Sequence, residues 1–535
     1  MDAAEIDKSW QAVGNVALAR AIGSPKFLLR HTTYVAGSRA KETVRDDGIR
    51  RTVVRVLPMS YAPEPAAMGL LSHAAFALKH ELPNLGLLAA TFRRVPPRAM
   101  ADYVALAPTG AYARRLGYLY EWLTGADVLG LLGPQFAVGG NFVNVLDPER
   151  VVTGEPVRVP RWRVDDNLLG TAAYAPMIER TPGSVTLGYD WRGAVAQSLG
   201  GLAPGADLLH RTLGYLYRKE TRSSFLIERD TPSAARSERF IAALQQAGRS
   251  TASQMLSETS LTGLQRLIVD ERFAAPAFRA HQNYVGSVAR WENVVHYVPP
   301  PPELLPGLMA GLASAVERMG AADPVAQATV ASFGFVFHHP FEDGNGRIHR
   351  FLLHDCLVRR GVVPDGVALP VSAAIMEDAA GYDRTLEAYS KLVGDVAQTE
   401  MDAKGALTVT NPAEAAWVWR YPDLTPQMEF LGKAMRRALA MIPEEILHLM
   451  RHDAVVTSAR DVIDLPDARL NELLACIHSN HGRLSKAKRG RFAALTDAEV
   501  QAVEKCYEAG YAAGPETTAV PAAIPDPART PGRRS

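Results

Sequence analysis

The strongest constraint on the fold of this 535-residue chain is the stretch Val325–Phe337, which is nearly all apolar. A helix over such a stretch has no polar face and has to be buried on every side. The stretches Leu304–Met319 and Ser233–Gln246 carry apolar residues on one face at helical spacing, which also predicts helices. We therefore expect the middle of the chain to be a helical bundle and the fold class to be mainly α.

The composition excludes several classes of protein. Hydrophobic residues make up 47% of the chain and charged residues 21%, values typical of a globular protein rather than a disordered or fibrous one. The 58 basic and 57 acidic side chains nearly cancel, so no overall field attracts nucleic acid or an anionic membrane. Any binding of that kind has to be local.

The cysteine pattern and the hydropathy of the chain indicate the cellular compartment of the protein. The three cysteines are far apart and form no CxxC pair, which argues against a disulfide scaffold and a zinc finger. The sequence starts without a signal-peptide pattern and holds no run of about 18 uncharged apolar residues. These features predict a cytoplasmic protein with no membrane partner.

Changes in composition along the chain predict five regions. Residues 1–165 carry no recognisable chemical signature, and we expect a mixed domain of unknown role there. Residues 166–232 form a connector, 233–404 the helical bundle and 405–512 a small helical domain. Residues 513–535 are mostly Pro, Ala, Thr and Arg, which predicts a disordered tail.

The most informative segment is His338–Arg350, with the sequence HHPFEDGNGRIHR, between the buried stretch and a second helical one. Gly344-Asn345-Gly346 suits positive φ and a close approach of the backbone to a ligand. The N–H groups of these residues would point outward at the start of the next helix, which favours an anion. Phe341 is expected to face inward as an anchor.

The charged residues of the segment indicate what the anion is. Arg347 and Arg350 are three apart and share one face of the first helical turn. Cations there oppose the helix dipole, so a bound anion is the best reason for their presence. Asp343 is suited to hold a Mg²⁺ that bridges phosphates, and His339, stiffened by Pro340, is suited to take a proton from a hydroxyl. Together they predict a triphosphate site.

The run from His339 to Arg350 resembles the HPFx[D/E]GNGRxxR signature of Fic domains, enzymes that move a nucleotide monophosphate from ATP onto a protein hydroxyl. In related Doc-type kinases, lysine replaces the second glycine and the γ-phosphate is transferred. Here that position is Gly346. The resemblance therefore implies an adenylyltransferase that uses ATP and Mg²⁺, acts on a target protein and is able to modify itself.

The resemblance also implies roles for single residues. His339 is expected to be the general base and Asp343 the Mg²⁺ ligand. Five residues are expected to bind the nucleotide. Arg347 would hold the β-phosphate and Arg350 the γ-phosphate. The anion hole would consist of Gly344, Asn345 and Gly346.

Two upstream segments fit the same family. His281–Val298 has a glycine turn and strand-like flanks before the four-proline run Pro299–Pro302. It looks like the β-hairpin flap that pairs with an extended target segment in Fic enzymes. The second segment contains Ser224 and Glu228 and resembles the (S/T)xxxE(G/N) inhibitory helix, although Arg229 stands where Gly or Asn is expected. Glu228 is expected to pair with Arg350 and so inhibit the enzyme.

Two other functions stay open at this point. His338, His339, His349 and the pair His354-Asp355 lie close together in the sequence, which is also compatible with a metal-dependent phosphohydrolase or a de-AMPylase. The basic stretch from Arg483 to Arg491 is able to contact DNA, as in a regulator with a non-catalytic Fic core. The oligomeric state, including a homodimer, is left open.

Overall fold

The computed structural model describes residues 10–23, 29–46, 51–63, 69–182, 184–200, 206–289 and 292–512. The chain forms two compact units, the first from Met1–Arg192 with Tyr215–Ala438 and the second from Gly193–Gly214 with Leu439–Ser535. Helices α7 (Ala206–Ile227) and α17 (Thr425–Arg460) contribute residues to both units. The tail predicted at 513–535 lies outside the described residues.

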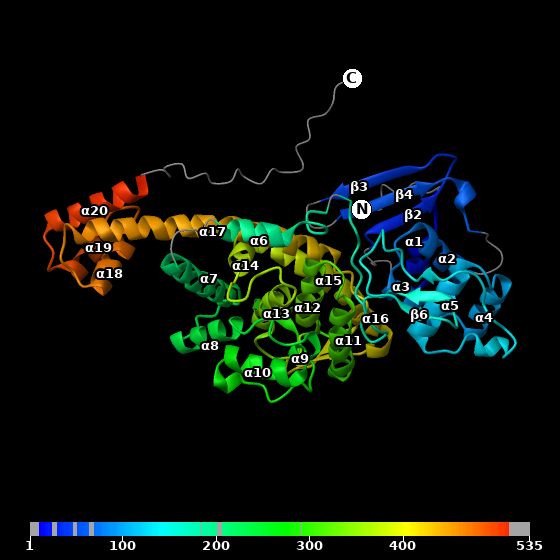
Figure 1. Ribbon diagram of the computed structural model, residues 1–535. Helices are drawn as coiled ribbons and strands as arrows, with labels where there is room; N and C mark the ends of the chain where they lie inside the picture. The colour runs from blue at the N-terminus through cyan, green and yellow to red at the C-terminus, as the bar shows by residue number, and fades with distance from the viewer. Residues whose placement is uncertain are drawn as a thin grey trace, which may run out of the picture. The chain divides into compact units, whose positions relative to one another are not determined.

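The N-terminal part of the first unit mixes strands and helices, as predicted. Its four-stranded sheet has the order β1-β2-β4-β3, in which β2 runs parallel to β4. Three short strands, β5, β7 and β6, form a second sheet further along the chain. The elements of this part, blue to cyan in Figure 1, are β1 (Gln11–Ala12), α1 (Gly14–Ala21), β2 (His31–Val35), β3 (Lys41–Asp46), β4 (Arg51–Leu57), α2 (Leu70–His80), α3 (Leu85–Phe92), α4 (Pro97–Leu106), α5 (Ala111–Thr124), β5 (Val143–Asn144), β6 (Val157–Val159) and β7 (Val164–Asp166).

The rest of the first unit is the predicted helical bundle. Its central helix α12 (Pro324–His338) packs against α11 and α13, and all its residues except Pro324 and Val336 are buried. The buried hydroxyls of Thr329 and Ser332 donate to carbonyls one turn back, at 2.8 and 2.7 Å, so they stay satisfied. The other helices are α8 (Ala234–Leu244), α9 (Ala252–Met255), α10 (Glu258–Ile268), α11 (Leu305–Arg318), α13 (Asn345–Arg359), α14 (Val371–Glu377), α15 (Ala379–Val396) and α16 (Pro412–Arg420).

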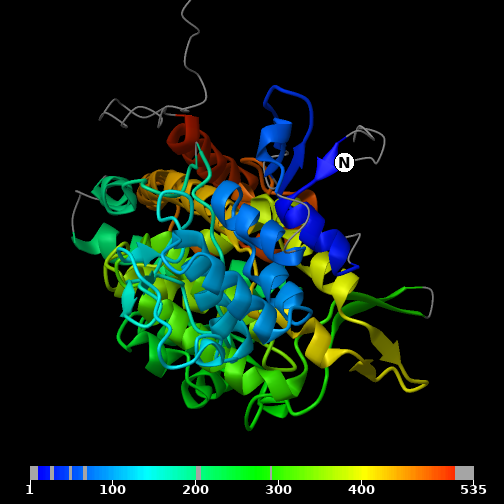
Figure 2. The ribbon, with the colours of Figure 1, turned by 90° about the vertical axis from the view of Figure 1, so that its right-hand side faces the viewer.

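Two β-hairpins extend from the bundle and lie side by side (Figure 2). The predicted flap is present as β8 (Val285–Ala289) and β9 (Glu292–Tyr297), with a bulge at Gly286. The second hairpin, β10 (Thr399–Met401) and β11 (Leu407–Val409), contacts the flap where Asn293 Nδ2 lies 3.6 Å from Met401 Sδ. The proline run after the flap is extended as far as Pro301 and then forms a 3₁₀ turn, Pro302–Leu304.

The second unit is small and helical. It takes up the C-terminal region from Leu439, so residues 405–438, which the sequence analysis assigned to that region, belong to the first unit. It contains α18 (Asp467–His478), α19 (Lys486–Arg489), α20 (Asp497–Ala512), the end of α17 and most of α6 (Trp191–Gly200). Its core includes Val455, Leu473 and Phe492. Within the described chain, no helix is both long and apolar enough to cross a bilayer.

Candidate active site

The HPF turn after α12 is held in place by buried hydrogen bonds. His339 ends the helix in the left-handed region, at φ 49°. Arg279, almost fully buried, donates from its backbone N–H to the Pro340 carbonyl at 2.8 Å and from Nε to the His339 carbonyl at 2.9 Å. Phe341 is fully buried as predicted. A non-glycine residue with positive φ is strained, and such strain is found most often at functional sites.

Asn345 fixes the other side of this turn. Its Oδ1 accepts from the Phe341 N–H at 3.1 Å, and its Nδ2 donates to the Phe341 carbonyl at 2.7 Å. The side chain is buried, at 2% exposure. Its amide therefore shapes the loop, and only the backbone N–H of Asn345 is left for the anion hole that the sequence predicts.

His339 is in the state that a general base requires. Its Nδ1 lies 3.3 Å from the Val336 carbonyl, which only accepts hydrogen bonds, so Nδ1 carries the proton and Nε2 keeps its lone pair. Burial, assisted by the nearby Arg279 cation, lowers the pKa of His339 to about 4. The ring is thus neutral at neutral pH and able to accept a proton at Nε2.

The glycine loop leads directly into a helix. Helix α13 begins at Asn345. Gly344 is left-handed, with φ 95°, and its N–H donates to Asp343 Oδ1 at 2.6 Å. Asn345, Gly346 and Arg347 therefore lie in the first turn, whose N–H groups have no intrahelical acceptor and are available to an anion.

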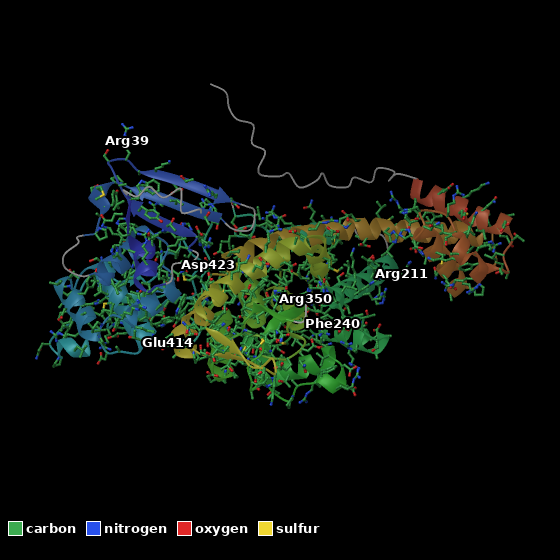
Figure 3. The ribbon with its side chains drawn as sticks, turned by 180° about the vertical axis from the view of Figure 1, so that it is seen from behind. Arg39, Arg211, Phe240, Arg350, Glu414 and Asp423 are labelled. Carbon is green, nitrogen blue, oxygen red and sulfur yellow. The ribbon has the colours of Figure 1, made fainter. Side chains whose placement is uncertain are left out.

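Arg350 lies inside the bundle, where Figure 3 shows it, and is only 1% exposed. Its Nε donates to Ser224 Oγ and its Nη2 to the Ser224 carbonyl, both at 2.8 Å. Nη2 also donates to Glu228 Oε1 at 2.8 Å. The structure thus brings together the three residues that the partial inhibitory motif had linked: Ser224, Glu228 and Arg350.

Arg347 is held by two carboxylates. Its Nη2 donates to Asp343 Oδ1 at 2.6 Å, and its Nη1 donates to Asp230 Oδ2 at 2.7 Å. The side chain is 3% exposed and lies over the Phe225 ring, 5.3 Å from the ring centroid. Both arginines of the motif are therefore paired with acidic side chains from the segment that follows α7.

The donor groups of the site fit the nucleotide and metal that the motif implies. Arg347 Nε and Arg350 Nη1 are buried and have no hydrogen-bond partner among the described residues. Buried guanidinium nitrogens without acceptors are costly, and phosphate oxygens would satisfy them. Asp343 lies at the same loop with half of its side chain exposed, and a carboxylate there suits Mg²⁺.

The end of α7 explains the departure at Arg229. The Asp230 N–H donates to the Phe225 carbonyl at 3.1 Å and the Arg229 N–H to the Leu226 carbonyl at 2.9 Å, which is the Schellman pattern of a helix end. That pattern needs a left-handed residue, and Arg229 adopts it with φ 54°. The Gly or Asn of the family motif is replaced here by a residue that takes the same backbone conformation under strain.

The histidines of the phosphohydrolase alternative are not brought together. His338 lies against Tyr174 with ring centroids 4.8 Å apart, and His349 lies against Phe333 at 4.6 Å. His354 Nε2 is 2.9 Å from Glu220 Oε1 of α7, in a buried hydrogen bond. In the described chain no three His, Cys, Asp or Glu side chains are grouped as a metal site requires.

The basic stretch proposed for DNA is paired within its own unit. Arg483 contacts Glu504 at 3.0 Å and Arg489 contacts Asp497 at 2.7 Å. Arg491 forms an ion pair with Glu472. Three of its five positive charges are therefore already neutralised by neighbouring carboxylates, which lowers the attraction for phosphates.

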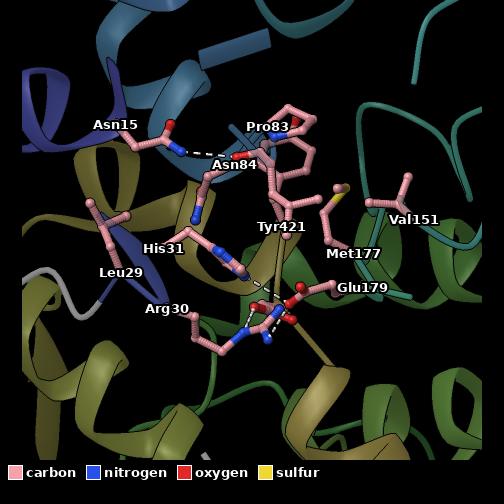
Figure 4. Close-up of a pocket in the computed structure, with 12 residues that line it drawn as sticks. Asn15, Leu29, Arg30, His31, Pro83, Asn84, Val151, Met177, Glu179 and Tyr421 are labelled. Atoms are coloured by element: carbon pink, nitrogen blue, oxygen red, sulfur yellow. Dashed lines mark hydrogen bonds and ion pairs between the residues drawn. The ribbon is translucent and has the colours of Figure 1, made fainter. Parts of the chain in front are cut away.

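A separate polar cavity of about 50 Å³ lies near the N-terminal sheet (Figure 4). Arg30 crosses it and donates to Asp423 Oδ2 at 2.5 Å and to Glu179 Oε2 at 2.6 Å. His31 Nε2 lies 2.9 Å from the same Glu179 oxygen. The charges of Arg30, Glu179 and Asp423 are paired with one another, so this cluster connects the sheet to the segment before α17. Among the described residues that line the cavity, Asn15 Oδ1 is buried without a hydrogen-bond partner.

Sequence reasoning missed three buried or charged residues of the site: Asp230, Arg279 and Glu220. Glu220 accepts from His354, from the Ser372 N–H and from the Ser372 hydroxyl, and so ties α7 to the bundle. Each lies far in sequence from its partner. Only the position of Asp230, two residues after Glu228, gave any signal.

Fold and site together define a helical domain in which a neutral histidine and two buried arginines flank a glycine loop at a helix start. Residues 255–357 match the model of the Fic/DOC family. The chain therefore carries a Fic domain. Membership of this domain family indicates an enzyme of the transferase type.

Solved structures with similarity to the chain include two Fic proteins. A Fic domain-containing signalling protein from Bacteroides thetaiotaomicron matches at 20% identity and TM-score 0.34, over 48% of this chain and 97% of that one. A Fic family protein from Desulfovibrio desulfuricans matches at 20% identity and TM-score 0.33, over 55% of this chain and 88% of that one. No curated protein matches the sequence.

Proposed function

We propose that this protein is an adenylyltransferase that transfers AMP from ATP to a hydroxyl of a target protein. The proposal is based on two features that occur in the same site. His339 is neutral, and two buried arginines, Arg347 and Arg350, lie near the start of α13. Buried cations at a helix N-terminus are unfavourable without an anion, and a triphosphate supplies one.

In the proposed reaction, His339 Nε2 takes the proton from the target hydroxyl. The hydroxyl oxygen then forms a bond to the α-phosphorus while the bond to the β-phosphate bridging oxygen breaks, and pyrophosphate leaves. Backbone N–H groups of the first turn of α13 are placed to stabilise charge on the phosphate oxygens. A Mg²⁺ held by Asp343 would neutralise phosphate charge.

The acceptor is expected to arrive on an extended segment. The flap β8–β9 is a two-stranded hairpin, and an open strand edge recognises a backbone by hydrogen bonds. Exposed Val294 on β9, at 39%, would add an apolar contact for the target.

Glu228 is proposed to inhibit this reaction. Its carboxylate occupies Arg350 Nη2, the group that the γ-phosphate is expected to use, and it lies over Gly346, where an added Cβ would overlap its carboxylate. While Glu228 stays in place, ATP is expected not to bind in the orientation that allows transfer of AMP.

His339→Ala tests the assignment of the base. Transfer of AMP is expected to fall by about 10² to 10⁴, whereas ATP affinity is retained because Asp343 and the arginines are intact. Activity above roughly a tenth of wild type, outside that range, would contradict the role of His339.

A further inference from the structure

A second carboxylate, Asp230, contacts an arginine of the motif. Its Oδ2 lies 2.7 Å from Arg347 Nη1 and 2.7 Å from Arg236 Nη2. Arg347 is nearly fully buried, whereas Asp230 keeps 27% of its side chain exposed. Each arginine of the motif thus contacts an acidic side chain: Arg350 contacts Glu228, and Arg347 contacts Asp230.

The two carboxylates belong to one small structural element. The Schellman turn at Arg229 reverses the chain directly after Glu228, and the Asp230 N–H is bonded to the Phe225 carbonyl. The guanidinium groups of Arg236 and Arg347 both lie near the Phe225 ring, each 5.3 Å from the ring centroid. A movement of this last turn displaces both carboxylates together.

Asp230 is able to release Arg347 at low cost. Its two oxygens already contact Arg236, at 2.7 and 3.5 Å, and Arg236 is anchored on the Ile268 carbonyl of α10 at 3.1 Å. When a phosphate replaces Asp230 on Arg347, the carboxylate therefore keeps a charged partner and is not left unpaired.

We infer that Asp230 is a second inhibitory residue, which blocks the β-phosphate subsite at Arg347 just as Glu228 blocks the γ-phosphate subsite at Arg350. This inference rests on the proposed function for the assignment of the two subsites. It predicts that the two carboxylates act on different nucleotides, because ADP has a β-phosphate and no γ-phosphate, and AMP has neither.

The test measures the affinity of the purified full-length protein for AMP, ADP and ATP in the presence of Mg²⁺. Asp230→Asn keeps the shape of the side chain and removes its charge, so ADP is expected to bind about tenfold more tightly, as for the loss of one competing charged hydrogen bond. ATP should also bind more tightly, and AMP should bind as in the wild type. Glu228→Gly should improve ATP binding much more than ADP binding.

Glu238→Gln is the matched control, because it removes one exposed negative charge from α8 and should change no nucleotide affinity. If Asp230→Asn does not fold, as judged by its thermal unfolding, Asp230→Ser should show the same preference for ADP. ADP affinity that is unchanged or weaker in the folded variant would overturn the inference and make Asp230 a structural partner of Arg347.

The result is independent of the transfer reaction. If no variant transfers AMP, the proposed function fails, but tighter ADP binding by Asp230→Asn still supports a phosphate subsite blocked by Asp230. If AMP transfer is observed and ADP binding does not respond, the proposed function stands and the role of Asp230 is rejected.

Discussion

Glu228 Oε1 lies 2.8 Å from Arg350 Nη2, and the same carboxylate lies so close to Gly346 that a Cβ added there would overlap it unless Glu228 moved. One side chain directly after α7 thus contacts both Arg350, the proposed phosphate clamp, and the first turn of α13. The contact joins residues 122 positions apart in the sequence, and it places the segment after α7 at the candidate active site.

Removal of this carboxylate should activate the protein. In Glu228→Gly, Arg350 loses its competitor, so AMP transfer to a target or to the protein itself is expected to rise by about tenfold or more, the equivalent of one charge-assisted hydrogen bond. The measurement is incorporation of label from α-labelled ATP at equal protein concentration.

The gain should depend on Arg350. In Glu228→Gly combined with Arg350→Ala, the increase is expected to vanish, because both groups act through one contact. A single variant that stays at wild-type activity, or a double variant that keeps the gain, would show that Glu228 does not inhibit through Arg350.

The strained turn after Glu228 gives a stability prediction. Arg229 is left-handed at the helix end, so Arg229→Gly should raise the free energy of unfolding by about 0.5 to 1 kcal/mol. Arg222→Gly is the control, since it makes the same change within α7 and should lower stability by about 1 kcal/mol. Urea midpoints that shift in the same direction for both variants would contradict the account of the turn.

Buried histidines should make the protein sensitive to acid. Burial lowers the pKa of His338 to about 3, so the folded state stays neutral while the unfolded chain takes up a proton near pH 6.5. The stability from this group is therefore complete above about pH 6.5 and is lost as the pH falls, by about 1.4 kcal/mol at pH 5.5.

His338→Phe tests that acid sensitivity directly. Neither ring nitrogen of His338 has a hydrogen-bond partner among the described residues, and a phenyl ring can keep the contact with Tyr174. Between pH 7.5 and 5.5, the free energy of unfolding measured in urea is expected to fall by about 1.4 kcal/mol less in the variant than in the wild type. An equal loss in both proteins would place the acid sensitivity elsewhere, for example at His349, whose pKa burial also lowers to about 3.

The helical bundle could be predicted because the stretch that forms α12 is apolar on all sides, and such a helix has to be surrounded by other elements. The motif likewise placed His339, Asp343 and the two arginines on one loop and helix, since its residue spacing is local. The contacts of Glu220, Asp230 and Arg279 depend on how distant segments pack. Apart from the position of Asp230 close to Glu228, no local pattern marks them, so their contacts became visible only in the structure.

The measurement that tests the central claim most directly compares ATP labelled at the α-phosphate with ATP labelled at the γ-phosphate, using the Glu228→Gly protein and a cell lysate as the source of targets. Label above that of the lysate alone is expected from α-labelled ATP only, and none when His339→Ala is added, because AMP is the transferred group and His339 the base. Label above the same background from γ-labelled ATP only, or transfer that survives His339→Ala, would contradict the proposed function.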